Sequence, residues 1–105
     1  MASQNSHLNY TNIDLEIEAI QRFRNLASIV PLDCHVYREL DRGFPILCLD
    51  FKACPQKLKM TKKQWFEFCR HLLYCSNYLG LSNSLIFQVG ERIVGWISLD
   101  QTNRP

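Results

Sequence analysis

Long apolar runs are missing from this 105-residue chain, and so is a strong excess of one charge. No stretch approaches the ~20 apolar residues that a transmembrane helix needs. The opening residues, MASQNSHLNYTN, also lack the apolar stretch of a signal peptide. The net charge is only +2, far from the basic footprint of a dedicated nucleic-acid binder. We therefore expect a cytoplasmic protein that does not bind membranes.

Closely spaced cysteine pairs and glycine-rich loops are absent as well. An odd number of cysteines cannot all pair internally, and such residues in a cytoplasmic chain are usually small buried hydrophobes. The five are Cys34, Cys48, Cys54, Cys69 and Cys75. His71 lies four residues before Cys75, but zinc sites usually draw their ligands from two such pairs. With no phosphate-binding glycine loop either, we expect no metal and no cofactor.

A single constellation suggests catalysis. His35 stands opposite Asp50 if the first hairpin has a two-residue turn, with Cys34 and Cys48 nearby. The three-residue turn that we expect through Gly43 shifts this register and separates the pair. A small enzyme around His35 is therefore only the third hypothesis, and we expect no catalytic residues.

The clearest structural signal is a helix that begins after Thr61. Thr61 and Gln64 form a capping box, and Met60 with Trp65 has the spacing of a hydrophobic staple. Gly80 has the position of a left-handed C-cap. The intervening residues are apolar on almost every side, so this helix is expected to be buried on several sides or to bind a partner.

The remaining elements predict one α+β domain over residues 11–100, after a flexible arm (1–10) and before a polar tail (101–105). An earlier helix is expected from an N-cap at Thr11 or Asn12 to about Val30, before Pro31. Its inward stripe comprises Ile13, Ile17, Ile20, Phe23, Ala27 and Val30. Strands are expected over residues 34–40, 44–51, 84–89 and 92–100. The order α-β-β-α-β-β then predicts a four-stranded antiparallel sheet packed with two helices.

The last hairpin is apolar on both faces. A type II′ turn at Gly90-Glu91 pairs Phe87 with Val94 and Leu85 with Trp96 on one face. The other face carries Ile86, Ile93, Ile97 and Leu99. Because an antiparallel sheet with one solvated face alternates cleanly, we expect a second cover from another subunit. The leading hypothesis is a non-catalytic protein-binding module, a regulatory, accessory or chaperone-like factor that forms a homodimer. Its predicted binding residues are Trp96, Leu85, Phe87, Val94, Ile86 and Ile93.

Nucleic-acid binding is the alternative hypothesis. Four lysines surround the start of the second helix, beside an aromatic ring that can stack on a base. The residues of this predicted site are Lys57, Lys59, Lys62, Lys63 and Trp65. The staple and the core already explain the tryptophan, and lysines before a helix are commonly solvated. We therefore rank protein binding first.

Overall fold

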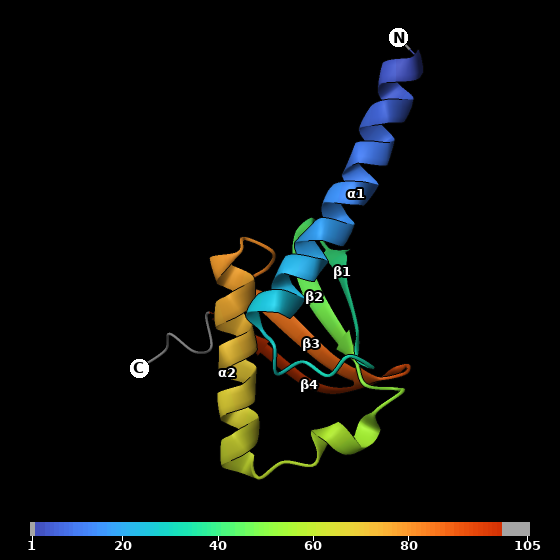
Figure 1. Ribbon diagram of the computed structural model, residues 1–105. Coiled ribbons are helices and arrows are strands. Elements are labelled where there is room, and N and C mark those ends of the chain that lie inside the picture. The colour runs from blue at the N-terminus through green and yellow to red at the C-terminus, as the bar shows by residue number, and fades with distance from the viewer. Residues whose placement is uncertain (1, 100–105) are drawn as a thin grey trace.

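The computed structural model describes the backbone of residues 2–99 and the side chains of residues 12–99. The elements follow the predicted order (Figure 1). They are α1 (Ala2–Leu26), β1 (His35–Asp41), β2 (Phe44–Asp50), the 3-10 turn η1 (Pro55–Leu58), α2 (Lys62–Tyr78), β3 (Ser84–Val89) and β4 (Arg92–Ser98). The α+β class and both hairpins are confirmed. The predicted tail, 101–105, lies outside the described residues.

The sheet is mixed rather than wholly antiparallel, which corrects one part of the prediction. Its strand order is β1-β2-β3-β4. The outer pairs, β1 with β2 and β3 with β4, are antiparallel hairpins, but β2 and β3 run parallel. Parallel neighbours need a crossover connection, and η1 with α2 supplies it by carrying the chain back along the sheet.

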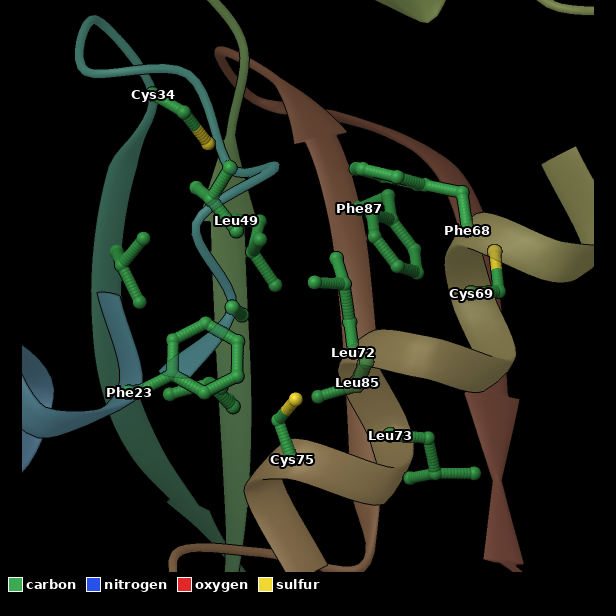
Figure 2. Packing of buried hydrophobic residues seen from close by; sticks show 14 of the residues in the cluster. Phe23, Cys34, Leu49, Phe68, Cys69, Leu72, Leu73, Cys75, Leu85 and Phe87 are labelled. Atoms are coloured by element: carbon green, nitrogen blue, oxygen red, sulfur yellow. The ribbon is translucent and has the colours of Figure 1, made fainter. Parts of the chain in front are cut away.

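Both helices contribute to one core on the same face of the sheet. Phe23 from α1 and Leu72 from α2 are fully buried, together with inward residues of the strands such as Leu49 and Phe87. Figure 2 shows these side chains converging between the helices and the sheet. The core is therefore a single layer between helices and sheet, and no helix within residues 2–99 covers the opposite face of the sheet.

Helix α1 begins at Ala2, so the predicted N-cap at Thr11 or Asn12 lies inside a helix. The backbone of the predicted arm is helical from Ala2 onward, while its side chains lie outside the described residues. No glycine or proline interrupts residues 2–26, and extending an existing helix carries no nucleation cost. The first half of α1 projects away from the sheet (Figure 1).

This projection divides the predicted inward stripe of α1. Phe23, Ala27 and Val30 are buried as expected, but Ile13 and Ile17 are exposed. The helix diverges from the β1–β2 hairpin here and leaves an open groove of about 750 Å³ between them. The stripe therefore reaches the core only with its C-terminal half.

The C-terminal end of α1 comes at Leu26, four residues before the predicted end at Val30. The guanidinium of Arg24 donates hydrogen bonds to the carbonyl oxygens of Pro31 and Cys34. These bonds hold the following turn against the helix, which allows the chain to leave the helix before the proline.

Helix α2 has the predicted caps. The backbone N–H of Gln64 donates to Thr61 Oγ1 at 3.1 Å, and the N–H of Thr61 donates to Gln64 Oε1 at 2.9 Å. At the other end, Gly80 has a φ of +72°. The N–H of Leu81 donates to Ser76 O and that of Gly80 to Asn77 O, which is the Schellman arrangement.

We expect Thr61→Ala to lower the free energy of unfolding by about 1 kcal/mol, because it removes one half of the capping box. Thr61→Ser keeps the hydroxyl and is the matched control. Urea unfolding followed by circular dichroism measures both. Equal loss in the two variants would mean that the threonine methyl, not its hydroxyl, stabilises this end of α2.

Candidate functional site

The first hairpin has a two-residue turn, so the predicted three-residue turn is wrong. Asp41 pairs with Phe44, and Arg42 and Gly43 both have positive φ, of 54° and 85°. Positive φ at both central positions defines a type I′ turn, whose twist matches that of the two strands. His35 therefore lies directly opposite Asp50.

The second hairpin has its predicted two-residue turn but a different register beyond it. Val89 pairs with Arg92, and Gly90 has a φ of +62°. A bulge follows, because Gln88 pairs with Ile93 while Phe87 pairs with Gly95. Val94 is the extra residue, and a bulge of this kind shifts the side-chain alternation by one position. Trp96 consequently lies opposite Ile86 rather than Leu85.

The cover by the helices and the bulge in β4 together decide which predicted binding residues can reach a partner. Leu85 and Phe87 are fully buried beneath the helices, so they are removed from the candidate surface. Ile97, predicted on the other face, is buried there too. Trp96 and Ile93 are exposed, and Ile86 is half-buried. The hairpin thus has an exposed face, but the one-residue shift of register in β4 changes which residues lie on it.

We call the sheet surface opposite the helices the open face. Strand register and alternation place on it His35, Tyr37, Glu39, Phe44, Ile46, Cys48, Asp50, Ser84, Ile86, Gln88, Ile93, Trp96 and Ser98. Across its centre, Tyr37, Cys48, Ile86 and Trp96 are successive cross-strand neighbours. We call these four the central row. It crosses all four strands.

The central row is apolar and ends in an exposed indole. Trp96 is 54% exposed, whereas Cys48 is 1% exposed because its larger neighbours cover it. Cross-strand side chains on one face lie close enough to pack. Exposed aromatic side chains within a polar rim are typical of protein–protein contact surfaces.

A hollow of about 600 Å³ lies between the end of the open face nearest the first turn and the connection from α2 to β3, which contributes Gly80, Ser82 and Asn83. Ile46, Ser84, Trp96 and Ser98 form part of its lining. Phe44 stands at its wall and is 75% exposed. The face therefore offers both a projecting aromatic side chain and a hollow that can receive one.

Polar residues occupy the other end of the open face. Asp50 Oδ1 accepts hydrogen bonds from the N–H groups of Gly90 and Lys52, each at 2.9 Å. The Gly90 bond is the main reason that the pKa of Asp50 lies below its ordinary value. The ring of His35 stacks on that of Tyr37, with 5.1 Å between centroids. Asp50 thus joins the end of β2 to the β3–β4 turn.

The pKa of Asp50 is lower in the folded state than in the unfolded chain, where an aspartate carboxyl has a pKa near 4. Ionised Asp50 therefore stabilises the fold at pH values above about 4. That contribution is lost as the pH falls through the folded-state pKa. We expect Asp50→Asn to reduce the difference in stability between neutral and acidic solution. Urea midpoints at both pH values measure it, with Asp14→Asn on the exposed side of α1 as control. An unchanged pH dependence would contradict the assigned role.

The cysteines have the environment of buried hydrophobes. All five are buried free thiols. Burial raises the pKa of Cys34 to about 12 and that of Cys48 to about 11, so neither thiol is ionised near neutral pH. His71 Nε2 lies 3.7 Å from Cys75 Sγ. Within residues 12–99, no three potential ligands gather around a point suited to a metal ion.

The predicted nucleic-acid site is divided by the fold. Lys57, Lys59, Lys62 and Lys63 are exposed along η1, the next connection and the first turn of α2. Trp65 instead faces the core, with its ring centroid 4.8 Å from that of Phe87. Its indole is therefore not a free stacking surface, and the lysines lose their predicted aromatic partner.

Comparison with known proteins gives no relative: no protein-family model, curated protein or solved structure matches this chain. In the part of the chain that the structure describes, no helix combines the length and apolar character needed to cross a membrane.

Proposed function

We propose that this protein is a non-catalytic protein-binding module and that it acts as a homodimer whose two open faces meet. The observation that carries the proposal is the exposure of Trp96 at the end of the central row. The role that we propose for such a binding module is regulatory, accessory or chaperone-like. The cytoplasm is its expected location.

The size of the open face suits a dimer. Neighbouring strands lie about 4.8 Å apart and rise about 3.3 Å per residue, so three strands of seven residues and one of six outline roughly 19 by 23 Å. This is of the same order as the roughly 800 Å² of accessible surface that each partner contributes to a standard interface. Two such sheets pack about 10 Å apart and bury the side chains between them.

The same face can complement itself. In a two-fold dimer, one surface must supply both the projecting group and the site that receives it. Phe44 projects from the open face beside the hollow that Ile46 and Trp96 line. The charged residues Glu39 and Asp50 lie away from the central row, toward the rim, where charge is tolerated in an interface. A second copy is therefore the occupant that we propose.

Light scattering over a concentration series tests the proposal. We expect the mass to rise toward twice 12.3 kDa as the protein concentration increases. Cross-linking should then capture a covalent dimer. Hydrogen exchange of the backbone amides of β1 to β4 should be slower at high protein concentration. A strict monomer at the highest attainable concentration would overturn the homodimer.

A further inference from the structure

The outer side of α2 carries exposed aromatic and basic side chains in one stripe. We define the α2 stripe as Lys63, Phe66, Arg70, Tyr74 and Tyr78. Phe66 is 54%, Tyr74 66% and Tyr78 69% exposed. At about 100° per residue, the first four lie within an arc of roughly 80° and Tyr78 lies at its margin. The side chains that α2 buries, such as Leu72, lie on the helix face toward the sheet (Figure 2).

Within the stripe, two pairs of side chains lie close together. The guanidinium carbon of Arg70 lies 5.5 Å from the centroid of the Phe66 ring. The rings of Tyr74 and Tyr78 are nearly parallel, with centroids 6.1 Å apart. The two tyrosines therefore present nearly parallel rings at the surface, and Tyr74 lies about one turn of α2 from Arg70. The span from Lys63 to Tyr78 is about 22 Å at 1.5 Å per residue.

The charge around the stripe is mainly positive, although one carboxylate, that of Glu67, lies within the arc of the stripe. Residues 51–90 contain six basic side chains and one acidic side chain, Glu67, which also lies on the exposed side of α2. Neither ion pair among residues 12–99 includes Lys63 or Arg70. Lys57, Lys59 and Lys62 extend the positive charge beyond the N-terminal end of α2. These cations are therefore available to an anionic partner.

We propose that the α2 stripe binds single-stranded nucleic acid, a function separate from dimerisation through the open face. Single strands are bound where cations follow the phosphates and aromatic rings stack on the bases. The α2 stripe combines both groups. The exposed tyrosines would thus supply the stacking rings that were predicted for Trp65, whose indole packs against the core instead. An acidic protein segment would use the cations but has no need of two parallel exposed rings.

The test uses the full chain and a short, fluorescently labelled oligouridylate, followed by anisotropy over a range of salt concentrations. We expect binding that weakens with salt. The double variant Tyr74→Leu/Tyr78→Leu should bind at least about fivefold more weakly at any one salt concentration, since one stacked base is lost. Its salt dependence should remain that of the parent, because no cation is removed.

The double variant Lys63→Gln/Arg70→Gln should weaken binding and also reduce the slope of log affinity against log salt by about 1.4, or about 0.7 per phosphate contact. Arg22→Gln/Lys52→Gln removes the same charge elsewhere and should keep the parent slope. All the substituted residues are exposed or lie at the surface, so circular dichroism and urea midpoints should stay close to those of the parent.

Three results would overturn the proposal. One is the absence of binding even at low salt. Another is equal loss in both basic double variants without any effect of the tyrosines, which would indicate only nonspecific attraction to polyanions. The third is capture of polyglutamate, but not of oligouridylate, through Lys63 and Arg70, which would indicate an acidic protein partner. Trp96→Ala should leave oligouridylate binding unchanged, which separates this proposal from the homodimer.

Discussion

Trp96→Ala is expected to weaken the homodimer by about 2–4 kcal/mol, the cost of removing an aromatic hot-spot residue from an interface. This corresponds to a rise in the dissociation constant of roughly 30-fold to several hundredfold. The indole ends the central row of the open face and lies beside the hollow near Phe44. Its removal therefore takes away apolar contact area beside this hollow.

The control for this variant is Tyr74→Ala. Tyr74 is also an exposed aromatic residue, but it lies on the outer side of α2, away from the open face. Sedimentation equilibrium at several concentrations gives the dissociation constants, and urea unfolding confirms that each variant folds. If Trp96→Ala folds well and dimerises like the parent, the interface lies elsewhere on the molecule.

Features that depend on a few neighbouring residues could be predicted from the sequence. The capping box of Thr61 and Gln64, the C-cap at Gly80 and the turn at Gly90 each depend on two to six consecutive residues. The sequence also predicted that the last hairpin is apolar on both faces. In the structure the helices bury the face that carries Phe87, while the face that carries Trp96 is exposed.

Features that depend on distant contacts could not be predicted in this way. In the first turn Arg42 has a positive φ, a conformation that is unfavourable in free energy for a residue other than glycine. Only the pairing of the two strands favours it here. The parallel pairing of β2 with β3 depends on where α2 returns the chain. The sequence of α2 is apolar on almost every side, so the exposure of the tyrosines of the α2 stripe became known only from the packing of that helix.

The bulge at Val94 also depends on a distant residue, Trp65, which packs against Gly95. A Cβ atom added to Gly95 would lie 2.7 Å from Cζ2 of Trp65 and 3.6 Å from Cδ2 of Phe87. The indole of Trp65, on α2, therefore lies directly over the backbone of β4. Only glycine leaves room for it there. With Gly95 fixed beneath the indole, the alternation directs Trp96 to the open face.

Gly95→Ala is accordingly expected to lower the free energy of unfolding by about 1–3 kcal/mol, the usual cost of overpacking. Elsewhere in a strand the same change would stabilise the protein by roughly 0.5–1 kcal/mol, because glycine loses more entropy on folding. Since Gly95 does not have a positive φ, backbone strain does not enter, and the sign of the effect reports the contact with Trp65 alone.

A double-mutant cycle separates this contact from a general loss of stability. Trp65→Phe removes the benzo ring that meets the new Cβ atom, so Gly95→Ala should cost less in that background, with a coupling of about 0.5–3 kcal/mol. Gly80→Ala is the control, because its φ is +72° and no atom lies within 4 Å of an added Cβ. Its cost comes from the backbone, and Trp65→Phe should not relieve it. Urea unfolding of the parent and the five variants gives every value. If Gly95→Ala proves as stable as the parent, the indole moves aside at no cost, and Trp65 does not fix the register that exposes Trp96.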